Sequence, residues 1–349
     1  MRHSRAAPAS LAMTGISRHD HYPHTDGKRR RAIRRAAGTL AAGWRGADEA
    51  PGGLLAALEA ASDLAPDDAI DRLLPWLADT GWLRARIGAA LSLLAADAFA
   101  RPPLRIVGGG GVPGGMILAE RGAIRLSLQL LPFETAAPPA TALFVPGRAA
   151  IRVLVAGGAR LTLHHVALTA IEEAGAFTAA GAAPCRNDPP RALLDGAMLR
   201  IDTARTSFTI AGPGPGPGRD VLLLELVVQP PSPLPMRSYD PGSGRLIHVA
   251  ASRRDSSFRQ MALGLLREMG RRDAASLFAA AVGAADFASR WAAMRDFVAL
   301  DPAAAFPHLA RMAAGDPHPE VRRAAASTLA LYPACPANAR DTGSAACRA

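Results

Sequence analysis

The amino-acid sequence predicts an α+β protein in which a central β domain lies between two helical regions. Three changes of pattern along the chain of 349 residues carry this prediction. Residues 51–103 place apolar side chains at helical spacing, whereas residues 104–251 form short alternating runs separated by Gly and Pro. From residue 252 helical spacing returns, and it repeats itself. A chain of this length can hold two or three domains with cores of their own.

The first 50 residues are rich in Arg, His, Gly and Ala and show little periodic hydrophobicity, so we expect a disordered leader at 1–50. This segment has ten Lys/Arg against four Asp/Glu, which is more than half of the formal charge of +10. Its basic run at 28–35 could contact nucleic acid or acidic lipid. Because no aromatic residue and no folded nucleic-acid-binding motif accompanies the run, we do not expect nucleic acid as a partner except through these residues.

The helical block at 51–103 shows three apolar stripes. The first begins at Leu54, the second follows Pro66, and the third follows Gly81. Trp76 and Trp82 are interpreted as packing anchors. The block ends at Arg101-Pro102-Pro103, because proline cannot continue a helix.

The central region reads as a β domain of about ten short strands, with no room for crossover helices, which predicts a sandwich or barrel. The expected strands are 104–107, 116–120, 124–131, 143–145, 151–155, 161–167, 198–202, 207–210, 221–228 and 246–250.

One stretch of this domain is similar to the cupin-type jelly roll. It consists of Ile151-x-Val153-Leu154-x-x-Gly157 followed by Leu161-Thr162-Leu163. In cupins, two histidines and a glutamate upstream of that glycine usually hold a metal ion. Counting back from Gly157 gives Leu143, Val145 and Ala150, which cannot ligate a metal. The resemblance therefore implies a cupin-like domain without the usual metal site, and we expect no metal or cofactor.

His164 and His165 are the histidines of interest in this domain. Neighbouring residues of a strand point to opposite faces, so the two side chains cannot easily share one ion. A structural role is preferred, and the alternative is contact with a small molecule in the domain interior, as in a sensor or enzyme. No Gly-x-Ser-x-Gly motif and no Cys-x-x-Cys pair is present, so the sequence indicates no catalytic residue.

The helical tail at 252–334 repeats with an offset of 31 residues, which pairs Ala293 with Ala324 and Pro302 with Pro333. The last unit contains Gly315-Asp316-Pro317-His318-Pro319 and then Val321-Arg322, and it resembles HEAT-type repeats. The resemblance implies that Arg322 reaches Asp316 and holds the turn together. The expected helices are 257–269, 273–283, 287–300, 303–314 and 319–331, followed by a disordered tail at 335–349.

HEAT-like repeats commonly present a surface to another protein. Arg290, Trp291, Arg295 and Asp296 form a dense group, in which Trp291 and Arg295 are four residues apart and could form a cation–π pair. We predict that this group contacts a protein partner. The alternative is that so short a tail packs against the β domain.

Taken together, these patterns favour a non-catalytic binding or regulatory protein that uses its helical-repeat surface. The alternative is a cupin-like small-molecule sensor or enzyme. No apolar run approaches the ~20 residues that span a bilayer, so we expect no membrane partner. Cys185, Cys335 and Cys347 give an odd count without a disulfide framework, which is typical of a cytoplasmic protein.

Overall fold

The computed structural model describes residues 27–97, 100–109, 112–132, 141–212, 219–250, 254–284 and 286–332. The chain forms two compact units. The first contains Met1–Gly46 and Leu83–Pro103, and the second contains Ala47–Trp82 and Leu104–Ala349. The expected tail at 335–349 and residues 1–26 of the expected leader lie outside the described residues.

The first unit holds most of two helices, α1 (Gly27–Glu49) and α4 (Gly81–Ala96). Arg29 Nε lies 2.8 Å from Asp97 Oδ2, and the guanidinium of Arg86 lies 5.5 Å from the centre of the Trp44 ring. The leader was expected to be disordered up to residue 50, but residues 27–49 are helical. The reason is a stripe of half-buried positions at helical spacing, which the dense positive charge masks in the sequence: Ile33, Ala37, Leu40 and Trp44.

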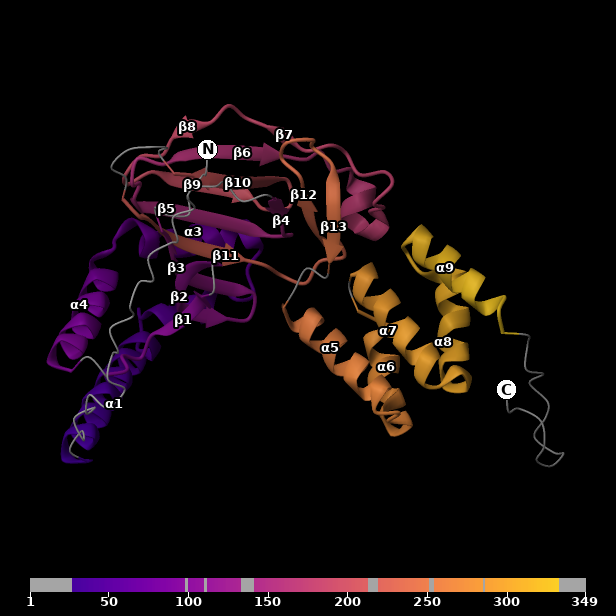
Figure 1. Cartoon of the computed structure of the whole chain (residues 1–349), viewed down its shortest axis with the longest axis horizontal. Coiled ribbons are helices and arrows are strands. Elements are labelled where there is room, and N and C mark those ends of the chain that lie inside the picture. Colours follow the sequence, from indigo (N-terminus) through magenta and orange to yellow (C-terminus); the bar gives the residue numbers. More distant parts are fainter. Residues whose placement is uncertain are drawn as a thin grey trace, which may run out of the picture. The chain divides into compact units, whose positions relative to one another are not determined.

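The centre of the second unit is a six-stranded antiparallel sheet in the order β1-β2-β3-β11-β5-β9 (Figure 1). β11 (Val221–Val228) occupies an inner position between β3 (Ile124–Leu131) and β5 (Arg148–Val155), from which it is far apart in sequence. The other members are β1 (Arg105–Gly109), β2 (Val112–Arg121) and β9 (Met198–Asp202).

Two smaller sheets complete the β domain. One pairs β6 (Arg160–His165) with β10 (Thr206–Ala211), β7 (Arg186–Asn187) and β8 (Arg191–Ala192). The other has the order β13-β12-β4, with bounds Leu246–Ala250, Met236–Tyr239 and Ala142–Phe144. These antiparallel pairings confirm the predicted β-rich centre. Strands β7, β8 and β12 were not predicted; β7 and β8 have two residues each, too few to show alternation.

The core of the sandwich lies between the six-stranded sheet and the sheet of β6 and β10. Val221 and Leu223 of β11 share one cluster with Ile151 of β5 and Leu161 of β6. Successive side chains of a strand alternate between faces, so Leu224 and Leu226 point to the other face, where they are also buried. Helices α2 (Leu54–Ala61) and α3 (Pro66–Ala78) lie against this sheet, with α3 contacting β5 and β11.

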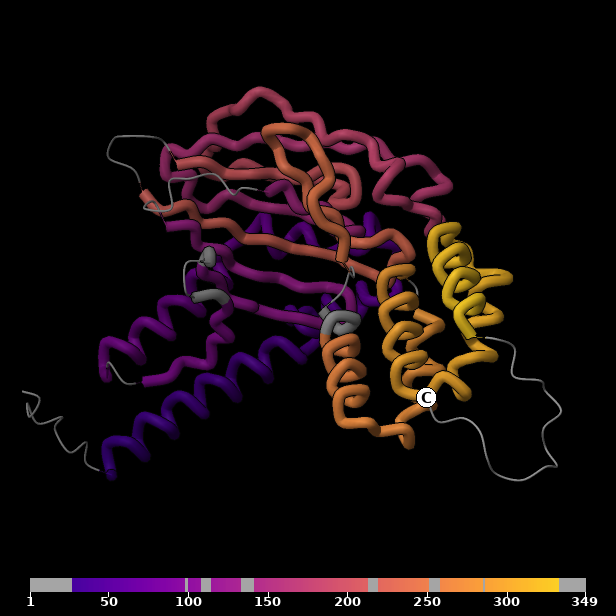
Figure 2. Tube along the Cα trace, turned by 45° about the vertical axis from the view of Figure 1, so that its right-hand side comes forward, coloured from indigo at the N-terminus to yellow at the C-terminus, as the bar shows by residue number. Residues whose placement is uncertain are grey.

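The helical tail consists of α5 (Arg254–Glu268), α6 (Ala275–Ala281), α7 (Phe287–Leu300), α8 (Pro302–Gly315) and α9 (Pro319–Leu329). Its helices stand side by side, as Figure 2 shows, with α7 in contact with both α5 and α8. The carboxylate of Asp286 caps α7 by accepting the Ser289 N–H at 2.7 Å, and that of Asp301 caps α8 by accepting the Ala304 N–H at 3.0 Å. The predicted helices of the tail agree with these bounds to within a few residues.

The predicted α+β architecture is therefore confirmed. An N-terminal helical region precedes an antiparallel β sandwich, and a helical repeat follows it.

Candidate functional site

Arg290, the first member of the predicted contact group, points into the tail. Its Nε and Nη2 donate to the two carboxylate oxygens of Asp316, both at 2.8 Å, and its Nη1 donates to the Ala284 carbonyl at 3.1 Å. Arg290 is 7% exposed and Asp316 is 6% exposed. A paired, buried guanidinium of this kind holds helices together and is not available to a partner.

The HEAT resemblance implied that Arg322 would reach the side chain of Asp316. Arg322 does reach this turn, but its Nη1 donates to the backbone carbonyls of Asp316 and Pro317. The carboxylate is taken by Arg290, 26 residues earlier in the chain, and by the backbone N–H of His318. The turn is thus held by arginines of two helices, Arg290 of α7 and Arg322 of α9. The sequence spacing around Asp316 does not reveal the pairing with Arg290.

The other three members of the group differ in their environment. Asp296 accepts a hydrogen bond from Arg267 Nη1 at 2.9 Å, which links α7 to α5. Trp291 is half-buried and packs against the core of the tail. Arg295 is exposed. Across the described ranges no cation–π contact joins Trp291 and Arg295. Only Arg295 thus offers a free charge, and its contact with a partner stays a prediction.

The turn between α8 and α9 also contacts the β domain. His318 is fully buried, its ring stacks on Phe287 with centroids 3.9 Å apart, and its Nε2 hydrogen-bonds to the Phe177 carbonyl. Phe287 in turn packs against the cluster that contains Phe177 and Leu234 of the β domain. The tail therefore meets the β domain through its turns, as one of the sequence interpretations allowed.

An apolar stripe runs along the outer side of α5 and includes Met269, the residue that follows the end of the helix. Its members are spaced by three, four and four residues, which places them along one side of the helix. Their side chains are largely exposed: Phe258 66%, Met261 66%, Leu265 61% and Met269 58%. We call these four residues the α5 stripe.

The opposite side of α5 is the one that packs. Leu263 is buried in the core of the tail, Gln260 Nε2 donates to Ser289 Oγ at 3.1 Å, and Arg267 pairs with Asp296 of α7. Helix α5 thus has one apolar face turned inward and a second turned to solvent. The residues that align the repeats, such as Leu263, belong to the inward face, and the second apolar period on the same helix is the sequence signal for the α5 stripe.

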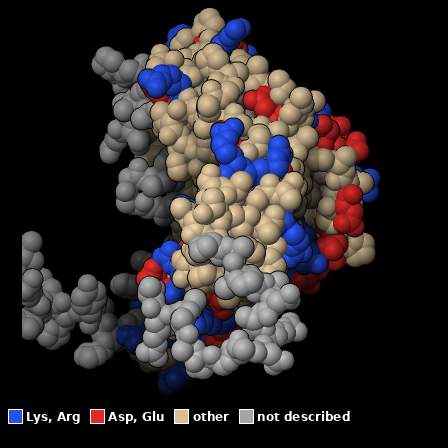
Figure 3. Space-filling model, turned by 90° about the vertical axis from the view of Figure 1, so that its right-hand side faces the viewer, with Lys and Arg blue, Asp and Glu red and all other residues tan. Residues whose placement is uncertain are grey.

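Figure 3 shows a face of the molecule on the side of the tail. Basic and acidic side chains lie in small groups, several of them beside each other, and most of the visible described atoms belong to neither class. Charge alone therefore does not define a contact area on this face.

His164 and His165 of β6 are not a ligand pair. His164 is 2% exposed, and both of its ring nitrogens are engaged: Nδ1 with Asn187 Oδ1 at 2.7 Å and Nε2 with Thr209 Oγ1 at 2.9 Å. His165 is half-buried and lies 3.2 Å from Asp188 Oδ2. His164 has the environment of a structural histidine, because neither ring nitrogen is left for a ligand.

A second polar group lies on the inner face of the sandwich. Glu225 shares this face with Val221 and Leu223 and pairs in register with Ser127 of β3. Its carboxylate accepts from Ser127 Oγ at 3.5 Å and from Gln129 Nε2 at 3.4 Å. Burial raises the pKa of the Glu225 carboxyl, and the nearby charge of Arg125 opposes that shift. Arg125 Nε is buried without a hydrogen-bond partner.

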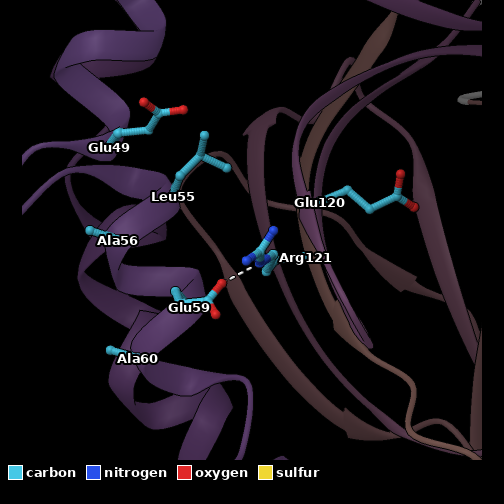
Figure 4. A pocket seen from close by; sticks show the side chains of 7 residues that line it. All are labelled: Glu49, Leu55, Ala56, Glu59, Ala60, Glu120 and Arg121. Carbon is cyan, nitrogen blue, oxygen red and sulfur yellow. Dashed lines mark hydrogen bonds and ion pairs between the residues drawn. The ribbon is translucent and has the colours of Figure 1, made fainter.

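A further hollow of about 790 Å³ lies between α2 and β2. In Figure 4 Arg121 and Glu59 meet across it, whereas Glu120 points away from α2. The hydrogen bond from Arg121 lowers the pKa of Glu59, so this pair is charged and mutually neutralised. Arg105 pairs with Glu120 at 2.6 Å. The hollow is thus lined by charged side chains together with Leu55, Ala56 and Ala60.

Within the described ranges, no group of three or more His, Cys, Asp or Glu side chains is placed to hold a metal ion. Over the same residues, no helix combines the length and the apolar character needed to cross a bilayer.

The tail is a helical-repeat module of the kind that mediates protein contacts. The family of HEAT repeats matches residues 245–330, which confirms the resemblance seen in the sequence. The match runs from the residue before β13 to the residue after α9. No curated protein matches the chain significantly in sequence.

Several solved structures resemble the β domain at low identity. One is an RmlC-like cupin protein from Ralstonia eutropha, with 11% identity, a TM-score of 0.24, and coverage of 42% of this chain and 72% of that one. A protein from Acidithiobacillus ferrooxidans with a provisional assignment as a sugar phosphate isomerase has 12% identity, a TM-score of 0.28, and coverage of 45% and 85%. Hazelnut vicilin, from Corylus avellana, has 14% identity, a TM-score of 0.23, and coverage of 39% and 34%. A cupin is the relative that the sequence pattern suggested, but TM-scores this low carry no argument about function.

Proposed function

We propose that this chain is a non-catalytic binding or regulatory protein whose helical tail contacts a partner protein through the α5 stripe. The exposure of Phe258, Met261, Leu265 and Met269 on one side of a helix is the observation that supports the proposal. Repeat arrays normally end in helices with a polar outer face, because an apolar end would associate. An apolar outer face on α5 therefore fits a surface that another protein covers.

The chemistry of the stripe indicates the kind of partner. Phe258 offers an aromatic ring, and Met261 and Met269 offer flexible thioether side chains that adapt to an apolar surface. The partner should present an apolar patch of helix length, such as one face of an amphipathic helix.

A photo-crosslinking amino acid at position 265 of the full-length protein, in its native host, tests this proposal. We expect a crosslink to one defined partner, and we expect Met261→Glu with Leu265→Glu to remove that partner from affinity purifications. The matched control is Leu91→Glu with the crosslinker at 91, because Leu91 is also an exposed helical leucine, at 58%. Arg295→Ala tests the remaining member of the predicted group.

Two results would contradict the proposal. The partner could survive the double α5 substitution, or position 91 could capture the same protein as position 265. Thermal unfolding serves as the folding control, since substitution of exposed side chains should leave the midpoint nearly unchanged.

A second candidate function, a small-molecule sensor or enzyme using the β-domain interior, is favoured by the Glu225 group rather than by the histidines. A raised-pKa carboxyl beside Gln129 and the unpartnered Nε of Arg125 suits a small polar ligand. Native mass spectrometry of the protein purified from its host should then show a bound species that Glu225→Gln weakens. If the native mass equals that of the protein alone, under conditions that retain weak complexes, this second candidate function is contradicted.

A further inference from the structure

Helix α1 has a charge pattern that works against its own stability. Its first nine residues carry Lys28, Arg29, Arg30, Arg31, Arg34 and Arg35, and its first turn contains no acidic residue. The N-terminal end of a helix is its positive end, where cations are unfavourable. Arg31 and Arg35 are also four residues apart on one side of the helix, where like charges repel.

Arg29 is neutralised within its own unit by Asp97 at 2.8 Å. Arg31, Arg34 and Arg35 are exposed, and their spacing of three and four residues puts them on one side of α1. We call these three residues the α1 basic face. The half-buried stripe that includes Ile33 and Ala37 lies on another side of the helix, so the arginines are left to solvent.

We propose that the α1 basic face binds the phosphate backbone of nucleic acid. Along the helix axis Arg31 and Arg35 are about 6 Å apart, so the face can meet neighbouring phosphates of one strand. Each guanidinium can donate two parallel hydrogen bonds to a phosphate. A polyanion also removes the repulsion that otherwise opposes the first turns of α1, which explains why a helix tolerates such a sequence.

The same helix argues against a membrane as the polyanion. An interfacial helix needs large apolar side chains exposed on one face. Among the described residues of α1 no large apolar side chain is exposed. Contacts with phosphates alone give little base readout, so binding should be nearly independent of sequence.

Nucleic acid was not expected as a partner, because no aromatic residue or folded binding domain accompanies residues 28–35 of the expected disordered leader. The helix at Gly27–Glu49 replaces that leader with an ordered array of arginines. This inference concerns α1 and is independent of the α5 stripe, so either can fail alone.

The test is fluorescence anisotropy of the full-length protein with a labelled 30-base-pair DNA duplex and a 30-nucleotide RNA, between 50 and 200 mM NaCl. The variant is Arg31→Gln with Arg34→Gln and Arg35→Gln. Glutamine is a good helix former, and circular dichroism checks that helicity is retained. The matched control is Arg259→Gln with Arg295→Gln and Arg323→Gln, which changes the net charge equally at three exposed arginines of the tail.

We expect the α1 variant to lose at least about tenfold in affinity and to lower the slope of log K against log salt by roughly 2–3 units, near 0.9 per lost phosphate contact for duplex DNA. The control should keep both values. Equal losses in the two variants would overturn the proposal, because net charge would then suffice. Failure of the wild-type protein to bind either probe at 50 mM NaCl would also overturn it, as would stronger binding to vesicles of phosphatidylserine and phosphatidylcholine than to nucleic acid.

Discussion

Replacing Arg290 by alanine should destabilise the tail far more than replacing Arg295, although both arginines lie on α7. Arg290 is 7% exposed and forms a two-pronged ion pair with Asp316. Its removal leaves a carboxylate that is 6% exposed, with the backbone N–H of His318 as a remaining donor. Breaking a buried pair in this way costs about 3–5 kcal/mol. A typical domain is stable by only about 5–15 kcal/mol, so the loss should open the tail.

Arg295→Ala is the control, because Arg295 is exposed and has no hydrogen-bond or ion-pair partner in the described part of the chain. Its cost should stay within about 0.5 kcal/mol. Urea unfolding followed by circular dichroism gives the free energies. Hydrogen exchange by mass spectrometry then shows whether the protection of α7, α8 and α9 is lost together.

A double substitution distinguishes the loss of the Arg290–Asp316 ion pair from the cost of leaving the Asp316 carboxylate buried and unpaired. Arg290→Met with Asp316→Asn removes both charges, and it should recover much of the stability that Arg290→Ala loses. The reasoning fails if Arg290→Ala costs no more than Arg295→Ala, or if the double variant is less stable than Arg290→Ala.

Three further predictions concern the β domain and its contact with the tail. Burial raises the pKa of Glu225 above its unfolded value of about 4.3, so the stability of the protein should fall as pH rises from that value to the folded pKa. Glu225→Gln should abolish this fall in the unfolding midpoints measured from pH 4.5 to 7.5. An unchanged dependence of the midpoint on pH in this variant would contradict the prediction. Arg237 is fully buried, and its Nε and Nη1 have no hydrogen-bond partner. Arg237→Met should therefore leave the free energy of unfolding in urea unchanged or raise it by about 1–4 kcal/mol. A lower free energy of unfolding would show that the fold needs the guanidinium. His318→Ala should lower the free energy of unfolding by about 2–5 kcal/mol and raise hydrogen exchange at both Phe177 and the α8–α9 turn. A rise in the tail alone would mean that the contact between His318 and Phe177 does not stabilise the β domain.

The helices of the tail could be predicted because their ends carry strong local signals. Asp301 and Pro302 cap and open α8, and Pro319 opens α9. Core positions such as Leu309 and Val321 follow the helical period and are buried. Each of these signals lies within one turn of the element that it marks, so no tertiary information is needed.

The contacts between elements could not be predicted in the same way. Arg290 and Arg322 are both plausible partners for Asp316, and only the packing of α7 beside α8 decides that Arg290 takes the carboxylate. The contact of His318 with Phe177 joins residues 141 positions apart. Helix α1 was missed for the opposite reason, because its strong charge suggested disorder while its weaker apolar period indicated a helix.

The distribution of these contacts decides where the tail can bind a partner. The most recognisable part of the repeat, the turn around Asp316 and His318, is used inside the chain. Substitutions there should disturb folding and binding together, so they cannot identify a binding surface. The outer face of α5 is largely exposed, so Met261 and Leu265 can be changed with little loss of internal packing. Loss of binding without loss of stability is therefore the result that would identify the α5 stripe as the functional surface of the tail.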